Sequence, residues 1–390
     1  MSDTIVRFPF SAIVGQERLK WAYLANLVRP GIGGLLISGP KGTGKTTIVF
    51  SVAEALPEND VVEGCLVGCD PAEPSEHCPH CRQRAKDAAL PVARRPMRVI
   101  NLPLSCTEDR LIGSIDVEKL LGQGTREVEP GLLGEAHRNI LYVDEVNLLP
   151  DHLVDDILDV AARHWNTIER EGVSFSHRSE FVLIGTMNPE EGDLRPQILD
   201  RFPLCARVET VSDPRLREEI VRRNLLFEKD PGELARLFAP EQARLRETIA
   251  RARAEVGNIV APPALLRATA TACSSLKVDG QRPDIVIIKT AGALAALNGA
   301  AEVGPAHLLM AAELALNHRT RDGGLLDPPS REDIHEAFRK GMAAAPADLE
   351  PHRAVRKELG ALGELAEPEP DPVQASGSRA REGETARKKA

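Results

Sequence analysis

The sequence predicts an α/β fold, in which a parallel sheet forms the core and a smaller all-helical domain follows it. Short apolar runs separated by helical patterns are typical of parallel strands that helices cover on both faces. Four such runs lie at residues 34–38, 97–102, 139–143 and 181–186. After about residue 211 the strand signals stop and helical patterns dominate. This succession indicates a wound α/β domain with a helical domain behind it.

Pattern and composition divide the chain into three parts. We expect an α/β domain over residues 1–211, a helical domain over 212–342 and a tail over 343–390. The tail is rich in Ala, Glu and Pro, a composition typical of disorder. Three segments interrupt the α/β pattern: a cysteine-rich insert at 62–85 and two predicted hairpins at 111–128 and 166–178. In the second hairpin, Glu171-Gly172 supplies the predicted turn.

Composition and charge narrow the class of protein. The 390 residues suffice for two domains, each with its own core. Apolar residues make up 42% and charged residues 27%, which is ordinary for a soluble globular protein. The formal net charge of −9 argues against a nucleic acid as the main partner. There is no long apolar run and no signal-peptide pattern, so we expect a cytoplasmic protein without a membrane span.

An apolar run, a glycine-rich loop and a helical pattern follow one another near the start of the chain. The loop matches the pattern G-x-x-x-x-G-K-T and comprises Gly39, Pro40, Lys41, Gly42, Thr43, Gly44, Lys45 and Thr46. Its glycines let the backbone curl until the N–H groups point at a phosphate, which the dipole of the following helix also attracts. Lys45 then bridges the β- and γ-phosphates, and the Thr46 hydroxyl ligates Mg²⁺. A plain glycine-rich turn is the alternative, but the strand and helix around it favour nucleotide binding.

Two later strand ends carry polar residues suited to hydrolysis. Asp144 and Glu145 end an apolar run, where Asp144 can hold Mg²⁺ and Glu145 can polarise the attacking water. Asn188 follows the next run, and from there it can reach the γ-phosphate and the water. An Asn-Pro turn is the alternative for Asn188. The sequence therefore predicts a hydrolytic site beside the phosphate loop.

Two arginines are candidates for contacts with the γ-phosphate. Arg201, in the stretch ILDRF, is either an ordinary surface charge or a residue that reaches the ATP of a neighbouring subunit. In the second case its guanidinium would accelerate hydrolysis by about 10³-fold or more. Arg282 begins a helical pattern in the helical domain. We expect it to touch the γ-phosphate of its own subunit and to couple the domain angle to hydrolysis.

Four of the seven cysteines gather in the insert: Cys65, Cys69, Cys78 and Cys81. The C-x-x-C pair has the spacing of a zinc half-site, and the C-x₃-C pair can supply the other half. An odd number of cysteines without a secretory signal argues against a disulfide framework. We expect no hydrophobic packing between the two halves. Three interpretations of the four cysteines stay open: a structural zinc site, a reduced metal-free loop, or a thiol pair that oxidises.

The motifs occur in the order of AAA+ ATPases: phosphate loop, acidic strand end, sensor asparagine, arginine finger and second sensor arginine. Longer stretches resemble the ATPase (I) subunit of magnesium chelatase, from about Phe8 to about Arg321. They include FPFSAIVGQERLK, LPLSCTEDRLIGSIDVEKLL, EPGLLGEAHRNILYVDEVNLLPDHLVDDILDVA and GTMNPEEGDLRPQILDRF. Stretches of this length are far more specific than a phosphate loop alone.

The resemblance implies a function and a set of roles. In that family the ATPase subunit forms a ring, commonly a hexamer, and works with a second ring of a related subunit that carries an integrin-I-like domain. Together they drive a large porphyrin-binding subunit that inserts Mg²⁺ into protoporphyrin IX on the route to chlorophyll. By the motifs they match, Asp144 and Glu145 serve Mg²⁺ and water, Asn188 is sensor 1, Arg201 is the finger toward a neighbour, and Arg282 is sensor 2. The two hairpins match the helix-2 insert and the pre-sensor-1 insert.

Two other functions stay open. A related AAA+ remodelling ATPase with an integrin-like partner would act on another protein or load another metal, as a cobalt-inserting chelatase does. A DNA-binding motor is the third candidate. The acidic balance and the 3% of aromatic residues argue against that motor, because stacking platforms need aromatic side chains.

Overall fold

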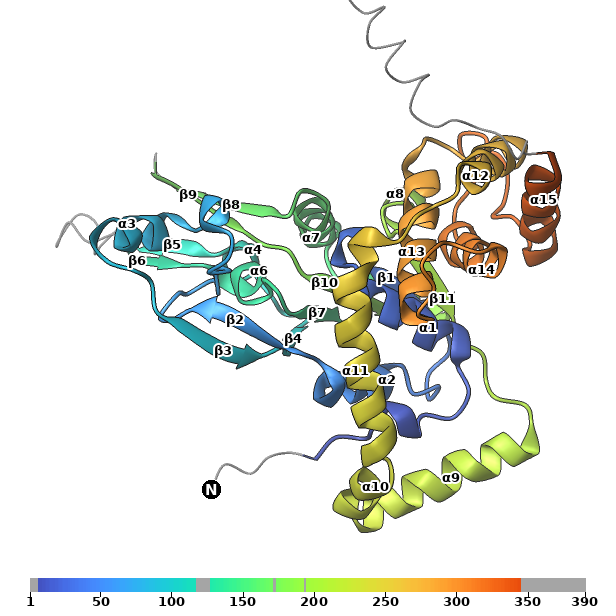
Figure 1. The fold of residues 1–390 in the computed structure, drawn as a ribbon, viewed down its shortest axis with the longest axis horizontal. Helices are drawn as coiled ribbons and strands as arrows, with labels where there is room; N and C mark the ends of the chain where they lie inside the picture. The colour runs from blue at the N-terminus through green and yellow to red at the C-terminus, as the bar shows by residue number, and fades with distance from the viewer. Residues whose placement is uncertain (1–5, 117–126, 171–172, 193, 345–390) are drawn as a thin grey trace, which may run out of the picture. The chain divides into compact units, whose positions relative to one another are not determined.

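A five-stranded parallel sheet forms the centre of the molecule (Figure 1). The computed structural model describes residues 6–116, 127–170, 173–192 and 194–344. The strands are β1 (Leu35–Ser38), β4 (Val99–Leu102), β7 (Ile140–Val143), β10 (Val182–Met187) and β11 (Leu204–Arg207), in the order β11-β1-β10-β7-β4. Each neighbouring pair is parallel. The predicted α/β fold class is confirmed.

Strand β11 is the one member of this sheet that the sequence patterns did not indicate. Its four residues include Cys205, Ala206 and Arg207, which carry little strand signal because they are neither β-branched nor aromatic. Tertiary pairing overrides that weak propensity, since Leu204 lies opposite Leu35 of β1. The other four strands match the predicted apolar runs.

Alternate residues of β1 enter two different cores. Leu35 and Ile37 belong to one buried cluster and Leu36 to the other, because successive side chains of a strand point to opposite faces. The first face packs against α1 (Glu17–Val28) and α2 (Lys45–Ser51). The helices on the second side are α4 (Glu108–Ile112), α6 (Gly131–Glu135), α7 (Asp151–Arg163) and α8 (Pro196–Leu199).

After β11 the described chain contains helices, with only isolated bridges between extended residues. The helices are α9 (Pro214–Lys229), α10 (Pro231–Leu237), α11 (Ala239–Glu255), α12 (Pro263–Ser275), α13 (Arg282–Leu297), α14 (Pro305–Leu316) and α15 (Arg331–Ala344). Helix α9 begins with an N-cap: the Asp213 carboxylate accepts a hydrogen bond from the Arg215 amide at 2.8 Å, and a proline occupies the first turn of the helix.

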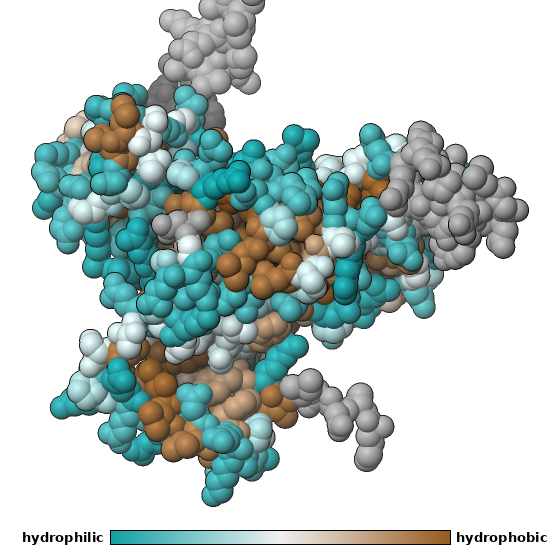
Figure 2. Space-filling model, turned by 180° about the vertical axis from the view of Figure 1, so that it is seen from behind, coloured by the Kyte–Doolittle hydropathy of each residue, from teal (hydrophilic) through white to brown (hydrophobic). Residues whose placement is uncertain are grey.

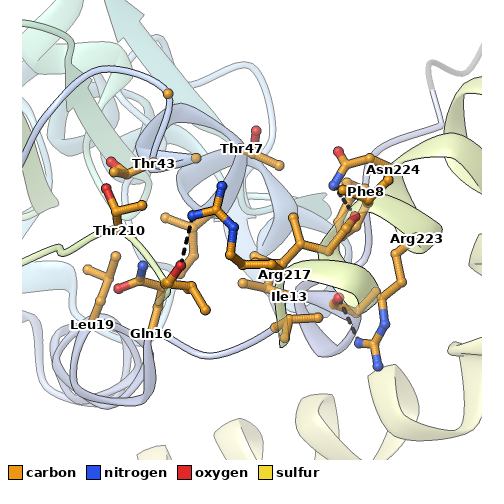
Figure 3. A pocket seen from close by; sticks show the side chains of 18 of the residues that line it. Phe8, Ile13, Gln16, Leu19, Thr43, Thr47, Thr210, Arg217, Arg223 and Asn224 are labelled. Atoms are coloured by element: carbon orange, nitrogen blue, oxygen red, sulfur yellow. Dashed lines mark hydrogen bonds between the residues drawn. The ribbon is translucent and has the colours of Figure 1, made fainter. Parts of the chain in front are cut away.

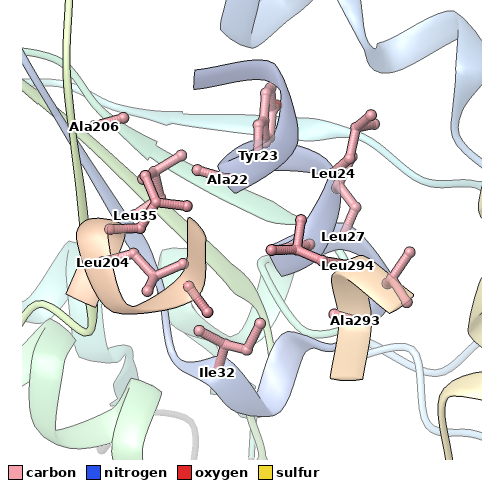
Figure 4. Packing of buried hydrophobic residues seen from close by; sticks show 14 of the residues in the cluster. Ala22, Tyr23, Leu24, Leu27, Ile32, Leu35, Leu204, Ala206, Ala293 and Leu294 are labelled. Atoms are coloured by element: carbon pink, nitrogen blue, oxygen red, sulfur yellow. The ribbon is translucent and has the colours of Figure 1, made fainter. Parts of the chain in front are cut away.

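The helical region shares its core with the sheet instead of forming a separate one. The cluster that holds Leu35 and Leu204 continues through α1 into α13, where Leu294 is buried (Figure 4). Helix α13 packs directly on α1. The expectation of two separate cores is therefore wrong, because α1 offers apolar side chains to both neighbours.

One lobe leaves apolar side chains in solvent. No residue of α9 is buried, and Leu216, Val221 and Leu225 on α9 and Leu237 on α10 are exposed. The space-filling view shows this apolar surface on the lobe at the bottom of Figure 2.

Three small antiparallel sheets project from the main sheet. They are β2 (Glu58–Val62) with β3 (Val92–Pro96), β5 (Ser114–Asp116) with β6 (Glu127–Glu129), and β8 (Trp165–Arg170) with β9 (Val173–Arg178). Helix α3 (Pro79–Asp87) lies between β2 and β3 in the chain. The predicted turn at Glu171-Gly172, residues 117–126 of the first hairpin and residues 345–390 of the tail lie outside the described residues. Within the described ranges, no helix combines the length and apolar character needed to span a bilayer.

Candidate nucleotide-binding site

The phosphate loop connects β1 to α2 and has a backbone that requires glycine. Gly42 and Gly44 have φ angles of 77° and 79°, in the left-handed region that side chains disfavour. At Gly39, an added Cβ would lie 2.5 Å from the Val208 carbonyl oxygen at the end of β11. The glycine spacing is therefore set by backbone conformation and by close packing against a neighbouring strand.

Lys45 lies at the first turn of α2 with its ammonium folded over the loop. Its Nζ donates to the carbonyl oxygens of Gly39 at 2.5 Å and Pro40 at 2.9 Å. Partial burial lowers the pKa of Lys45, while Asp144 and Glu145 act in the opposite direction. These two carboxylates are therefore close enough to Lys45 to interact with its charge.

A hydroxyl network joins the phosphate loop to the acidic end of β7. The Tyr142 hydroxyl donates to Asp144 Oδ1 at 2.8 Å and lies 3.3 Å from Thr46 Oγ1. Thr186, fully buried in β10, donates to the same Asp144 oxygen at 2.6 Å. Its oxygen also accepts the Glu145 amide at 3.1 Å. Thr46 and Asp144 thus face one another with oxygen atoms, the ligand type that Mg²⁺ prefers.

Thr186 was not among the predicted site residues, although a signal for it was present. It lies two residues before Asn188, and residues two apart on a strand point to the same face. Its contact with the Glu145 amide helps to hold Glu145 at a φ of 51°, a left-handed conformation that is costly for a residue with a side chain. The hydroxyl therefore fixes both carboxylate-bearing residues.

Asn188 follows β10 and lies at the same edge of the sheet. Since β10 pairs with β1 on one side and with β7 on the other, Asn188 stands between the phosphate loop and Asp144-Glu145. Its side chain is almost fully buried, and its Oδ1 accepts the Glu190 amide at 3.2 Å. Asn188 thus forms the predicted turn, and its contact with the γ-phosphate stays a prediction.

A cavity of about 600 Å³ opens beside the phosphate loop (Figure 3). Its walls come from the loop, from residues 8–19 and from residues 209–224. Arg217 extends from α9 across it and donates to the Val211 carbonyl at 3.1 Å. Ile13, Val14 and Ile48 give it apolar walls, which suit a flat nucleobase. The sequence motifs did not indicate this second half of the site, because its lining has no fixed spacing.

Comparisons with known proteins agree with this geometry. Residues 84–202 match the AAA domain (dynein-related subfamily), and residues 266–338 match the AAA lid domain. The chain is 48% identical over 314 residues to the magnesium-chelatase subunit ChlI homolog of Methanocaldococcus jannaschii, covering 80% of this chain and 86% of that one. It is 47% identical to the magnesium-chelatase 38 kDa subunit of Acidiphilium rubrum, covering 80% and 91%. The chain belongs to the magnesium-chelatase ATPase-subunit family.

A solved structure gives the same fold. A protein from Cytophaga hutchinsonii, described as an ATPase, superposes with a TM-score of 0.54 at 17% identity, covering 85% of this chain and 91% of that one. A structure of the complex between subunits BchI and BchD of magnesium chelatase is 41% identical, with a TM-score of 0.49, covering 85% and 99%. As a member of the magnesium-chelatase ATPase-subunit family, the chain is an AAA+ ATPase that uses ATP and Mg²⁺.

The two predicted arginines lie together, far from the phosphate loop of their own chain. Arg201 precedes β11 and donates to Asp155 of α7 at 2.9 Å and to Asp159 at 3.2 Å. It therefore belongs to the edge where parallel strands begin, whereas the phosphate loop follows the end of β1. Burial lowers the pKa of Arg282, and neighbouring Arg201 lowers it further. Arg282 is thus a neighbour of Arg201.

This position favours a role for Arg282 other than the one expected from the sequence. Contact with the γ-phosphate of its own subunit would require it at the opposite edge of the sheet. Helix α13 packs on α1 and near η2 (Pro30–Ile32), so its first residue is held at the amino edge. Arg282 of the helical region and Arg201 of the α/β region therefore lie next to one another.

The four cysteines of the insert form a compact cluster of thiols, and all four are buried. Their sulfur atoms lie within 4.8 Å of one another, with Cys65 and Cys78 at 3.9 Å. Tetrahedral zinc with Zn–S bonds of about 2.3 Å would place its sulfurs about 3.8 Å apart, so the donor set fits. Hydrogen bonding from Cys69 holds the pKa of Cys65 well below its usual range, whereas burial raises the pKa of Cys81. A metal ion bound by the four sulfurs would favour loss of their protons.

The expectation that no hydrophobic residues pack between the cysteine pairs is wrong. Val62 and Val67 are buried in the cluster, and Leu90 and Phe175 pack against it. Val67 lies between the first two cysteines in the chain, and Phe175 comes from strand β9. The apolar shell limits solvent access to the sulfurs, as in structural metal sites.

Proposed function

We propose that this chain is the ATP-hydrolysing motor subunit of a magnesium chelatase. It drives Mg²⁺ insertion into protoporphyrin IX, which a separate porphyrin-binding subunit holds. The observation that carries the proposal is the 48% identity to a ChlI homolog over 80% of the chain, together with an intact nucleotide site. ATP hydrolysis supplies the free energy, and the porphyrin chemistry takes place on the other subunit.

At the nucleotide site each residue has a distinct task. The loop amides and Lys45 bind the phosphates, while Thr46 and Asp144 hold Mg²⁺. Glu145 polarises the attacking water, and Asn188 orients that water relative to the γ-phosphate. Bound Mg²⁺ neutralises the charge that develops on the phosphoryl oxygens. Thr186 fixes the direction of Asp144 through its 2.6 Å hydrogen bond, so the metal ligand needs little reorganisation.

The hydrolytic site is completed by a neighbouring copy of the chain in a homo-oligomeric ring, which we propose to be a hexamer. Support comes from the separation of Arg201 and Arg282 from the phosphate loop of their own chain. Arg201 is 41% exposed, and its ion pairs are surface pairs that a phosphate can displace. Its guanidinium would stabilise the transition state on the adjacent subunit, with Arg282 beside it.

Further partners are proposed from the named relatives. The structure of the BchI and BchD subunits concerns a complex of two chelatase subunits. For this chain we propose a partner with an integrin-I-like domain and a large porphyrin-binding subunit. A direct nucleic-acid partner is not part of the proposal.

We also propose that Cys65, Cys69, Cys78 and Cys81 bind one structural zinc ion. The four thiols surround a volume of the right size, and the apolar shell around them suits a closed site without a catalytic opening. Elemental analysis of protein purified without chelators is expected to give one zinc per chain. A metal-free preparation with four reactive thiols would contradict this site.

The substrate is tested by reconstitution. The chain would be purified with its proposed partner subunits, and the metal-porphyrin product would be identified after ATP addition. Magnesium protoporphyrin IX is expected. Insertion of cobalt, or remodelling of a protein without any metal insertion, would support the alternative of a cobaltochelatase-type or other chelatase-like ATPase. ATP hydrolysis without any product that depends on the partner subunits would contradict the proposed function.

A further inference from the structure

The cysteine insert has almost no hydrophobic core apart from its four sulfurs. Among the described residues, its buried cluster consists of Val62, Val67 and the four cysteines, with Leu90 and Phe175 packed against it. A core of this size buries too little apolar surface to hold about 30 residues in place. Small modules of this kind depend on a cross-link, and a metal held by four thiolates provides one. The order of the insert is therefore tied to metal binding.

One side of the cluster is completed by a different part of the chain. Phe175 comes from β9, yet its ring packs against the sulfur cluster. A second contact joins the same strand to the insert, since Arg178 Nε lies 3.2 Å from Glu76 Oε2. The Arg178 side chain is only 19% exposed, so solvent screens this ion pair less than a typical surface pair. Helix α3 also lies against β9.

The other side of the insert is attached to the base of the main sheet. Arg138, just before β7, forms an ion pair with Asp70 at 2.9 Å. Its carbonyl oxygen accepts the Asn59 side-chain amide at 2.7 Å, and its own amide donates to Glu180 at 2.7 Å. The insert thus bridges the start of β7 and the hairpin formed by β8 and β9.

Both acidic residues of these contacts belong to the loop between the cysteine pairs. Asp70 follows Cys69 directly, and Glu76 lies two residues before Cys78. A metal that fixes the four sulfurs therefore fixes the carboxylates that hold Arg138 and Arg178. Hairpin β8–β9 continues through Ser179 and Glu180 toward β10, the strand that carries Thr186 at the nucleotide site.

We propose that the metal-loaded cysteine cluster is a clamp that holds hairpin β8–β9 against the base of the main sheet. The inference rests on the zinc site proposed above and goes beyond it, because it assigns the metal a target outside the insert. With the metal bound, Phe175 and Arg178 have a fixed surface to pack on. Without it, the insert loosens and the hairpin loses one of its supports.

Hydrogen exchange on the full-length protein tests the clamp. Zinc content is measured first, and the protein is then compared before and after zinc removal by a chelator, and again after addition of zinc chloride. We expect amide exchange in residues 165–170 and 173–178 to become about tenfold faster on removal and to return on reloading. Strands β1 and β11 should not change. Unchanged hairpin exchange in a protein that has lost its zinc would overturn the clamp.

A point variant separates the clamp from general unfolding. Phe175→Ala removes the ring from the cluster but none of the four sulfurs, so zinc content should stay at one per chain while hairpin exchange accelerates. Phe175→Leu, which keeps an apolar side chain, should restore most of the protection. Slow exchange in Phe175→Ala with zinc retained would also overturn the proposal. Cys106→Ser is the control, because this buried cysteine lies outside the cluster.

Fluorescence gives a second readout. The chain has two tryptophans, Trp21 in α1 and Trp165 in β8. In a Trp21→Phe background, Trp165 emission should shift to longer wavelength when zinc is removed, since its half-buried ring gains solvent. If the purified protein never contains zinc, the metal site itself is refuted. If the protein binds zinc but the emission wavelength of Trp165 does not change when zinc is removed, only the clamp is refuted. Neither result depends on ATP hydrolysis, so both are distinct from a failure of the proposed motor function.

Discussion

The two edges of the central sheet carry different halves of the proposed catalytic apparatus. At the carboxyl edge, the phosphate loop, Asn188 and Asp144-Glu145 follow three adjacent strands. Hydrogen bonds of 2.6 to 3.3 Å through Tyr142 and Thr186 link Thr46 to Asp144 and Glu145. At the amino edge, Arg201 and Arg282 lie beside acidic residues of α7. Because the two groups of residues lie at opposite edges of the sheet, a single chain cannot bring them together. We therefore propose that this ATPase needs a second copy, which brings the amino edge of one subunit to the carboxyl edge of the next.

The largest effect is expected from removing the proposed general base at the carboxyl edge, Glu145, which should almost abolish ATP hydrolysis. Glu145→Gln keeps the shape of the side chain but removes the carboxylate, so ATP hydrolysis should fall by about 10³-fold while ATP binding is kept. Steady-state hydrolysis and binding of a fluorescent ATP analogue measure the two properties. Glu190→Gln is the matched control, because Glu190 is an exposed carboxylate nearby. Hydrolysis at the wild-type rate in Glu145→Gln would remove Glu145 from the mechanism.

A substitution at the amino edge should lower the rate of ATP hydrolysis without destabilising the fold. Arg282→Ala should lower the ATPase rate of the assembled protein by about 100-fold, since one charged donor to the transition state is lost. The melting temperature and ATP affinity of the unassembled chain should stay near wild type, because Arg282 does not contact its own phosphate loop. A strong loss of ATP affinity in the unassembled chain would instead place Arg282 at its own nucleotide.

Both edges could be predicted only in part from the sequence. The motif residues were identifiable because each has a local pattern, such as glycines at fixed spacing or two carboxylates after an apolar run. The position of Arg282 depends on how α13 packs on α1, and residues more than 250 positions apart in the chain set that packing. Thr186 could have been identified from its place two residues before Asn188, on the same face of the strand, whereas Arg217 lacks a spacing pattern. The cysteines could be grouped by spacing, but their closeness depends on Phe175 and Arg138 from other segments.

A smaller effect is expected at Thr186, which supports the carboxyl edge without touching substrate. Thr186→Val removes one of the two hydroxyl donors to Asp144, so that half-buried carboxylate keeps only Tyr142 as a hydroxyl partner. The Mg²⁺ concentration for half-maximal ATPase activity should rise by about tenfold, whereas ATP binding without Mg²⁺ should not change. Thr186→Ser keeps the hydroxyl and should behave like wild type. Equal Mg²⁺ dependence in all three proteins would limit Thr186 to packing.

The smallest expected effect is a loss of folding stability at acidic pH, caused by a buried histidine near the amino edge. His318 is buried, and its Nε2 lies 2.9 Å from the carbonyl oxygen of Phe202, next to Arg201. Burial lowers the pKa of His318 to about 3, against 6.5 for the free side chain. Between these values the unfolded chain binds the proton and the folded chain does not, so stability is present above about pH 6.5 and is lost as the pH falls below it.

Urea unfolding at pH 7.5 and pH 5.5 measures this dependence. The free energy of unfolding should fall by about 1 kcal/mol from His318 alone. His318→Gln should show a correspondingly smaller difference between the two pH values, while His152→Gln, at an exposed histidine, should keep the wild-type difference. An equal pH dependence in wild type and His318→Gln would exclude this histidine as the acid-sensitive group.

Mixing two inactive variants tests the sharing of the site between subunits most directly. Arg201→Ala lacks the finger and Lys45→Ala lacks the phosphate anchor, so each protein alone should hydrolyse ATP at a small fraction of the wild-type rate. In a mixed ring with equal amounts of both, about a quarter of the interfaces join an intact phosphate loop to an intact arginine. We predict that ATPase activity partly returns on mixing, in proportion to co-assembly measured with two affinity tags. Confirmed co-assembly without any recovery would contradict a site shared between neighbouring subunits.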